Sequence, residues 1–244
     1  MRKRTSLFVK KRKKIYRSSF FWYSIFFFLF FYFFYLFVFA GPLFLIKNFQ
    51  VETKDPFLAK RIFLFLKPRN LLFLNSKELK KEIEDRFLET KNVVFKKKYP
   101  DTLELRVEER DELFEFCSQS CFVSDDQGFL FSQKAKKEIP KIFVGEDLYL
   151  KKTILSKNEI LNISQIIEYL KKREMFFDKI KIENKNLIFE NPQGFSLLFD
   201  PQKDSQWQIK KLFTFLDKTE DKEKLKKIKK IDLRFGNFVN FEYY

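Results

Sequence analysis

The sequence predicts an α+β protein held in a membrane by one N-terminal helix. Three observations indicate this architecture. First, Phe20–Phe39 is almost entirely aromatic or aliphatic. Second, helical and strand-like patterns alternate through the roughly 200 residues that follow, as in a sheet covered by helices. Third, the first of these patterns run in the order β-α-α-β-β, which predicts a three-stranded sheet backed by two helices.

The net charge of +16 is concentrated at the N-terminus. Residues 1–19 contain nine Lys or Arg and no acid, and no charged residue occurs again before Lys47. The rest of the chain has 40 basic against 33 acidic residues, so most of the excess belongs to the short tail. The distal part lacks the strongly basic balance that nucleic-acid binding needs, and no nucleic-acid partner is predicted.

The apolar run is long enough to cross a bilayer. A helix rises 1.5 Å per residue, so about 20 residues span the ~30 Å hydrocarbon layer. We assign residues 1–19 to a basic cytoplasmic tail and residues 20–42 to a transmembrane helix. Positive residues stay on the cytoplasmic side, which predicts a C-terminal domain outside the plasma membrane. The tail serves as the orientation signal, or alternatively binds acidic lipids or a cytoplasmic partner.

A cleaved signal peptide is the alternative interpretation of the same run. Val38-Phe39-Ala40 loosely fits a cleavage site. The run is longer than the 7–15 apolar residues of a usual signal core, which favours a retained anchor.

Residues 46–110 begin with one strand and two helices. Residues 46–51 form a strand pattern, and Asp55 with Pro56 starts a helix, since proline is favoured at the first helical position. Asn75 caps a second helix whose apolar residues recur every four positions. Two strands follow, at 93–98 and 102–109, and the second alternates apolar and charged residues, which is typical of a strand buried on one face.

The span from Asn70 to Arg110 resembles a POTRA domain. The resemblance rests on Asn70-Leu71-Leu72-Phe73-Leu74, the helix 75–87, the strand 91–98 and the run from Tyr99-Pro100-Asp101 to Arg110. Because a membrane helix directly precedes it, the span is similar to the POTRA domain of the FtsQ/DivIB bacterial cell-division proteins. One departure is visible: a proline usually follows the family's Glu-Arg closely, whereas Asp111-Glu112 stand here.

Two cysteines lie in a short predicted hairpin. Leu113–Cys117 and Cys121–Ser124 are strand patterns joined by three residues, a length that suits a hairpin and brings the sulfurs near each other. In an exported compartment Cys117 and Cys121 can form a disulfide; two free thiols are the alternative. A catalytic redox pair is not favoured, since the spacing exceeds Cys-x-x-Cys by one residue.

Helix and strand patterns continue to the C-terminus. Ser156 with Glu159 predicts a capping box for one helix, and Ser205 with Gln208 opens another. Their order resembles the β-domain that follows the POTRA domain in the same family. We therefore assign 46–110 to a POTRA domain and 111–244 to an FtsQ-like β-domain, a mixed or antiparallel sheet with flanking helices. The strongest local similarities to the family are Asp126-Gln127-Gly128, Ile139-Pro140 with Gly145, and Ile231–Phe235. The strands predicted in the C-terminal part of this domain are 179–183, 187–190, 195–199, 230–235 and 238–244.

No catalytic, cofactor or metal site is recognisable in the sequence. Histidine is absent, and the five glycines do not form a nucleotide-binding loop. Asp125-Asp126 lacks the further acids of a calcium loop, and two cysteines are too few for zinc. A binding module rather than an enzyme is expected.

The resemblance implies a scaffold of the bacterial division complex, located at the septum. It implies FtsB/DivIC-like and FtsL-like coiled-coil proteins as partners, with other divisome proteins meeting the POTRA domain. A terminal strand at a sheet edge offers unpaired backbone groups to such a partner. The partner-binding candidates are Arg234, Phe235, Phe238 and Phe241.

Three other interpretations remain open. Each partner-binding candidate is alternatively an ordinary residue of the β-domain's core or strand surface. The chain is alternatively a POTRA-containing envelope protein for the translocation or assembly of other proteins. A membrane-anchored wall-modifying enzyme is the third, and it requires a cleft with a paired acid and base.

Overall fold

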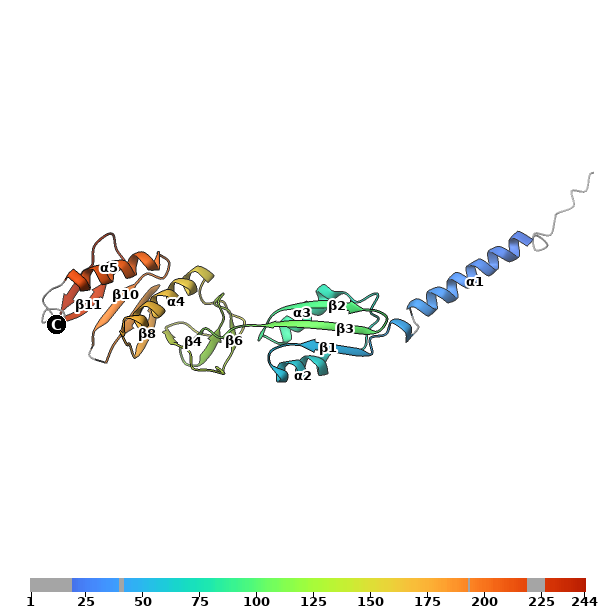
Figure 1. Cartoon of the computed structure of the whole chain (residues 1–244), viewed down its shortest axis with the longest axis horizontal. Helices are drawn as coiled ribbons and strands as arrows, with labels where there is room; N and C mark the ends of the chain where they lie inside the picture. The colour runs from blue at the N-terminus through green and yellow to red at the C-terminus, as the bar shows by residue number, and fades with distance from the viewer. Residues whose placement is uncertain (1–18, 40–41, 193, 219–226) are drawn as a thin grey trace, which may run out of the picture. The chain divides into compact units, whose positions relative to one another are not determined.

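The computed structural model describes residues 19–39, 42–192, 194–218 and 227–244. Most of the basic tail and the Lys-rich stretch 219–226 lie outside these residues. The chain divides into two compact units (Figure 1). The first comprises Met1–Ile83 with Val93–Val107, and the second comprises Glu84–Asn92 with Glu108–Tyr244.

Helix α1, Ser19–Phe39, begins the described part of the first unit. Its segment Phe20–Val38 is long and apolar enough to cross a membrane, and no part of that segment is buried within the protein. A helix that is apolar all round is typical of a segment surrounded by lipid. One N-terminal helix of this kind suggests a single-pass membrane protein. The described helix ends at Phe39, and Pro42–Phe44 forms a separate 3₁₀ helix, η2.

The β-α-α-β-β order predicted for residues 46–110 is confirmed. The sheet has the order β1-β3-β2, with β1 parallel to β3. Asp55 caps α2 by accepting the N–H of Phe57 at 2.9 Å, and Asn75 caps α3 by accepting the N–H of Lys77 at 3.2 Å. The elements are β1 Asn48–Glu52, α2 Pro56–Phe65, α3 Ser76–Arg86, β2 Thr90–Lys98 and β3 Thr102–Glu109.

Strand β3 shows why the alternating pattern identifies this sheet. Leu103, Leu105 and Val107 are buried, whereas the charged residues between them are not. Leu58 and Ile62 of α2 and Leu79 and Ile83 of α3 are buried as well. The helices therefore contribute their apolar stripes to the core that the sheet's inner face also forms.

The second unit contains a nine-stranded mixed sheet with the order β12-β11-β10-β9-β8-β7-β4-β5-β6. Figure 1 shows helices α4 and α5 side by side along this sheet. The predicted cysteine hairpin forms β4 and β5, whereas β7 was not predicted. The elements are β4 Phe114–Cys117, β5 Cys121–Ser124, β6 Leu130–Ser132, β7 Lys141–Val144, α4 Lys157–Lys172, β8 Lys179–Glu183, β9 Asn186–Glu190, β10 Ser196–Phe199, α5 Ser205–Lys218, β11 Ile228–Asp232 and β12 Asn240–Tyr243.

The two helices begin differently. Ser156 and Glu159 form the predicted capping box of α4. Helix α5 begins at Ser205, as predicted, and Asp204 caps it by accepting the N–H groups of Gln206 and Trp207. The buried hydroxyl of Ser205 donates to Gln165 of α4. Ser205 therefore starts α5 and also joins it to α4.

Candidate partner-binding surface

Strand β12 is the last strand of the nine-stranded sheet and lies at its edge. All four of its residues are exposed. It pairs with β11 on one side only, with Phe241 opposite Ile231 and Asn240 opposite Asp232. Within the described residues, no other strand covers its second side. This side therefore presents backbone donors and acceptors to solvent.

The outward backbone groups can be identified from one hydrogen bond. The N–H of Tyr244 donates to the carbonyl of Lys227, on the β11 side, at 3.0 Å. N–H groups alternate in direction along an antiparallel strand. The N–H of Glu242 therefore faces β11, and the N–H groups of Phe241 and Tyr243 face away from the sheet.

The turn between β11 and β12 is held by a lysine of α5. Lys211 Nζ donates to the carbonyl oxygens of Leu233 at 2.5 Å, Phe235 at 3.2 Å and Gly236 at 3.1 Å. The same ammonium lies 3.7 Å from the ring centroid of Trp207. Burial lowers the pKa of Lys211, with the nearby Asp232 carboxylate acting in the opposite direction. One ammonium thus fixes the backbone of residues 233–236.

A second lysine and an ion pair organise the same turn. Lys203 Nζ donates to the carbonyl oxygen of Arg234 at 2.9 Å and lies 5.7 Å from the ring centroid of Phe235. The guanidinium of Arg234 binds both carboxylate oxygens of Asp232, from Nε at 2.8 Å and from Nη2 at 2.5 Å. Lys203 and the Asp232–Arg234 pair thus add to the contacts of Lys211 that hold this turn.

An apolar groove with a basic rim lies between α5 and the segment 237–241. Its volume is about 490 Å³. Phe215, Phe238 and Phe241 line its apolar part, and Lys210 and Lys218 contribute to its rim. Phe241 packs against Phe215, with 5.3 Å between ring centroids. This composition is suited to a ligand that places an apolar side chain in the groove and an acidic side chain at its rim.

The structure brings the four predicted residues into one region but gives them different environments. Phe238 is 77% exposed and Phe235 is 54% exposed, so both rings are open to solvent. Phe241 is 42% exposed and is partly used in packing on Phe215. Arg234 has its guanidinium occupied by Asp232. The phenylalanines are thus better placed than Arg234 to contact a partner.

Sequence reasoning missed Trp207, Lys211 and Phe215. All three lie on α5, far along the chain from the predicted residues. Their spacing of i, i+4 and i+8 places them on one helix face, which is a signal for a shared role. Nothing in the sequence shows that this face meets the terminal hairpin, because that contact depends on tertiary packing.

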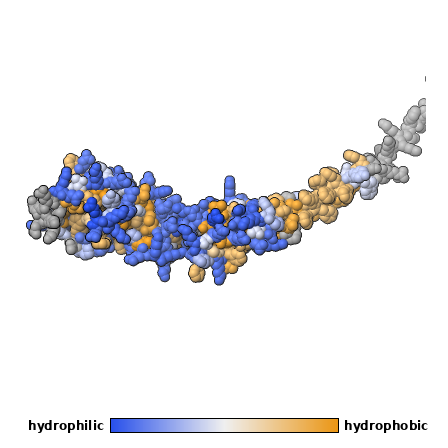
Figure 2. Space-filling view, viewed as in Figure 1, coloured by the Kyte–Doolittle hydropathy of each residue, from blue (hydrophilic) through white to orange (hydrophobic). Residues whose placement is uncertain are grey.

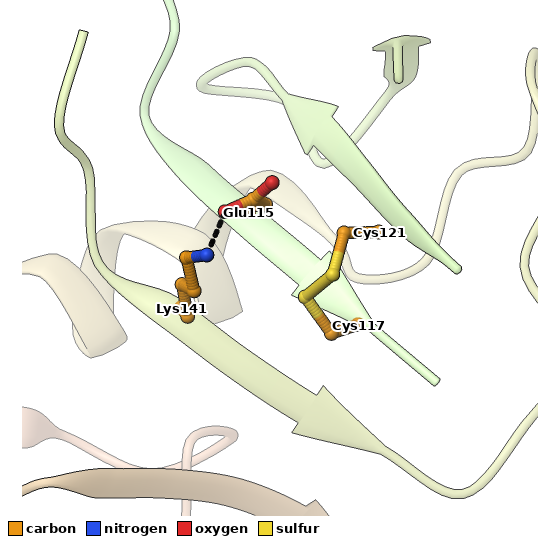
Figure 3. Close-up of a disulfide and its surroundings, with 4 residues drawn as sticks. All are labelled: Glu115, Cys117, Cys121 and Lys141. Carbon is orange, nitrogen blue, oxygen red and sulfur yellow. Dashed lines mark ion pairs between the residues drawn. A yellow bond between two sulfur atoms is a disulfide. The ribbon is translucent and has the colours of Figure 1, made fainter. Parts of the chain in front are cut away.

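The cysteine hairpin forms a second candidate site, shown in Figure 3. Cys117 and Cys121 are directly opposite in the β4–β5 register, and their sulfurs are joined at 2.07 Å. Glu115 lies close enough to both sulfurs to complete a three-ligand group. Its carboxylate instead pairs with Lys141 Nζ at 3.2 Å. Sulfurs joined to each other are not thiolate ligands, so the oxidised hairpin does not favour a metal.

A cavity of about 750 Å³ in the second unit is lined by Glu146, Glu159 and Glu183, which makes it a candidate enzyme cleft. Glu159 accepts from the N–H of Ser156 at 2.8 Å and from Gln202 Nε2 at 3.1 Å. Burial raises the pKa of Glu159, but these hydrogen bonds outweigh burial and lower it overall. A general acid at neutral pH needs the opposite shift. Glu146 in the same cavity pairs with Lys152 at 2.6 Å. Glu159 and Glu146 are therefore both engaged in hydrogen bonds or ion pairs within the fold.

Comparison with known proteins gives one family match, within the β-α-α-β-β segment. Residues 60–110 match the family model of the POTRA domain, FtsQ-type. No curated protein matches the chain. The FtsQ-type POTRA family is a family of non-enzymatic scaffold proteins. A POTRA domain of the FtsQ type that follows an N-terminal apolar helix fits an FtsQ/DivIB-like cell-division protein.

Proposed function

We propose that this chain is a scaffold of the bacterial division complex, with a cytoplasmic tail, one membrane helix, a POTRA domain at 46–110 and an FtsQ-like β-domain at 111–244. The FtsQ-type POTRA domain supports a role in cell division. The scaffold links cytoplasmic and extracytoplasmic division components and helps regulate septal peptidoglycan synthesis. Imaging a tagged full-length copy in dividing cells tests this role: a mid-cell band is expected, and uniform envelope staining contradicts it.

The exposed edge of β12 is the observation that carries the partner assignment. An extended segment of an FtsB/DivIC-like protein, in complex with an FtsL-like protein, adds itself there as a tenth strand. Backbone hydrogen bonds to the outward groups of Phe241 and Tyr243 give the affinity. Phe235, Phe238 and the basic-rimmed groove select the partner's side chains.

A proline substitution tests the backbone pairing directly. Tyr243→Pro removes an outward N–H that pairs with nothing in the sheet, and edge strands tolerate such a proline. Tyr243→Ala removes the same side chain and keeps the N–H. We expect the proline variant to lose co-purification with the coiled-coil partners while the alanine variant retains it. Equal binding by the two folded variants would exclude strand addition at β12.

A charge substitution tests the side-chain contacts. Phe238→Asp and Phe235→Asp alter exposed rings and leave the core intact. Phe176→Asp is the matched control, since Phe176 is 75% exposed in the same unit and lies outside the groove. We expect the first two variants to lose most partner binding and the control to keep it. Phe241 is less suitable, because Phe241→Asp would also break its packing on Phe215.

A further inference from the structure

The end of the first unit next to α1 is built from three segments that are distant in sequence. The N–H of Ile46 donates to the carbonyl of Arg69 at 3.0 Å, and the N–H of Leu71 donates to the carbonyl of Phe44 at 2.7 Å. The N–H of Lys47 donates to the carbonyl of Asp101 at 2.9 Å. Residues 43–47, the loop 69–73 and the turn 99–101 therefore form one surface.

This surface is tied to the membrane helix itself. The side-chain amide of Asn70 donates to the backbone carbonyl of Val38 at 3.3 Å, within the last turn of α1. The carbonyls of a helix's last turn lack partners inside the helix. If α1 crosses the bilayer, this carbonyl lies at the outer interface, and the loop that binds it lies at the same depth.

The surface has the composition of a membrane interface. Leu43, Leu45 and Phe73 are exposed apolar residues, and Tyr99 is 59% exposed with its ring against Phe44. Tyrosine concentrates at the headgroup level because its ring is apolar and its hydroxyl is polar. Figure 2 shows hydrophobic surface on the end of the unit that adjoins α1.

Two basic residues adjoin the segments of this surface in the chain. Lys47 directly follows the apolar 43–46 stretch, and Lys67 precedes the 69–73 loop; both are exposed. Lysine extends its ammonium from an apolar surface towards phosphate groups. The surface therefore offers apolar contact to acyl chains and positive charge to lipid headgroups.

We propose that this surface, defined by Leu43, Leu45, Phe73 and Tyr99 and called the membrane seat, lies in the outer interface of the bilayer that α1 crosses. Tyr99 and Phe73 act as interfacial anchors, and Lys47 and Lys67 contact lipid phosphates. The membrane seat restrains the first unit against the membrane, so that the POTRA domain does not swing freely on its anchor. This inference rests on α1 crossing the membrane and is independent of partner binding at β12.

Tryptophan fluorescence of the full-length protein in lipid vesicles tests the membrane seat. The native tryptophans, Trp22 and Trp207, are replaced by Phe, and one tryptophan is introduced as Tyr99→Trp. The vesicles contain phosphatidylcholine and phosphatidylglycerol, with or without bromine on the acyl chains near the headgroup. We expect blue-shifted emission for Tyr99→Trp and quenching by the brominated lipid.

Phe57→Trp in the same background is the matched control. Phe57 is 80% exposed, lies at the start of α2 in the same unit, and has no place in the membrane seat. Quenching several-fold stronger at position 99 than at position 57 supports the membrane seat. Equal quenching, or water-like emission at both positions, overturns it.

A third variant separates failure of the anchor from failure of the membrane seat. Trp207→Phe alone leaves Trp22 as the reporter of α1. Quenching of Trp22 without quenching at position 99 shows that the helix is inserted and the membrane seat is wrong. A lack of quenching at Trp22 contradicts the membrane anchor itself and, with it, the inference.

Discussion

Asp125 shows how one residue fixes a turn in the second unit. Its side chain is fully buried, and one carboxylate oxygen accepts the N–H groups of Gln127 and Phe129 at 2.9 and 3.0 Å. The other oxygen binds the guanidinium of Arg110, whose Cζ lies 4.2 Å from the ring centroid of Phe129. Gly128 completes the turn with φ +74°, where a Cβ would lie 2.3 Å from the carbonyl oxygen of Leu155.

The neighbouring acids Asp125 and Asp126 allow a matched test. Asp125→Ala leaves the Arg110 charge without its partner and two N–H groups unpaired, so the free energy of unfolding should fall by about 3 kcal/mol. Asp126 pairs with Lys91 at 3.0 Å, but its side chain is 44% exposed, so Asp126→Ala should lower the free energy of unfolding by about 1 kcal/mol or less. Urea unfolding of both variants measures the difference. Similar losses would show that the burial of Asp125 does not matter.

Asp232 gives a prediction about pH. Burial raises its pKa, but hydrogen bonds from the side chain and backbone of Arg234 outweigh burial and lower it below the ordinary value of 3.8. A carboxyl whose pKa is lowered by folding stabilises the protein above its unfolded pKa, and this stability is lost as pH falls through the folded value. Asp232→Asn should therefore be less stable than the wild type at pH 7.

The lowered pKa of Asp232 also determines how the difference in stability between the wild type and Asp232→Asn changes with pH. As pH decreases below about 4, the wild type loses the Asp232 contribution, and the two stabilities should converge. Urea unfolding at pH 7, 5, 4 and 3 measures both curves. A difference that stays constant over this range would show that the Asp232–Arg234 pair contributes no pH-dependent stability.

At the scale of elements, α5 positions the terminal hairpin through Lys211. Lys211→Met keeps an unbranched side chain but removes the ammonium that binds several turn carbonyls, so it should lower the free energy of unfolding by about 1–3 kcal/mol. Lys210→Met, on the exposed side of α5, should change it by less than about 0.5 kcal/mol.

The mobility of the terminal turn provides a second test that compares Lys211→Met with Lys210→Met. Hydrogen exchange of peptides covering 233–244 should become faster in Lys211→Met than in Lys210→Met, because the hairpin loses its support. Partner binding should weaken in parallel, since a disordered turn must be ordered on binding. Unchanged exchange in Lys211→Met would mean that the ammonium does not hold the turn.

The β4–β5 hairpin gives a prediction about redox state. If the second unit is exported, Cys117 and Cys121 should resist alkylation in the denatured, unreduced protein, as mass spectrometry can measure. Cross-linking a loop of about five residues should raise the free energy of unfolding by about 2 kcal/mol. The double variant Cys117→Ser with Cys121→Ser should therefore be less stable by that amount. Reduced wild type is the control. Two alkylated cysteines in protein taken from its native compartment would contradict the prediction.

At the scale of the whole molecule, the property to test is the orientation of the chain across the membrane. Nine basic residues precede α1, so the positive-inside rule places the tail in the cytoplasm. Protease added to intact spheroplasts should therefore digest residues beyond about 46 and leave a short membrane fragment. A C-terminal portion that survives until the membrane is opened would reverse the orientation.

Local signals in the sequence predicted much of the fold correctly. Asp55-Pro56 and Ser156 with Glu159 predicted helix starts, because caps depend only on nearby backbone groups. Alternation predicted β3, because one face of that strand is buried and the other is not. Strand β7 escaped prediction: Lys141–Val144 is only four residues long, and its identity comes from pairing with β4 and β8.

The sequence by itself determined an apolar helix long enough to span a membrane, the β-α-α-β-β unit and the hairpin that brings Cys117 opposite Cys121, since hydrophobic period, capping and turn length act over a few residues. Only the tertiary structure decided that β12 is a sheet edge, that Lys211 holds the terminal turn, and that Asn70 binds the end of α1. These features depend on contacts between segments that are far apart in the chain. Sequence periodicity shows which face of an element is buried, but burial of apolar surface is non-directional and does not specify which segments meet.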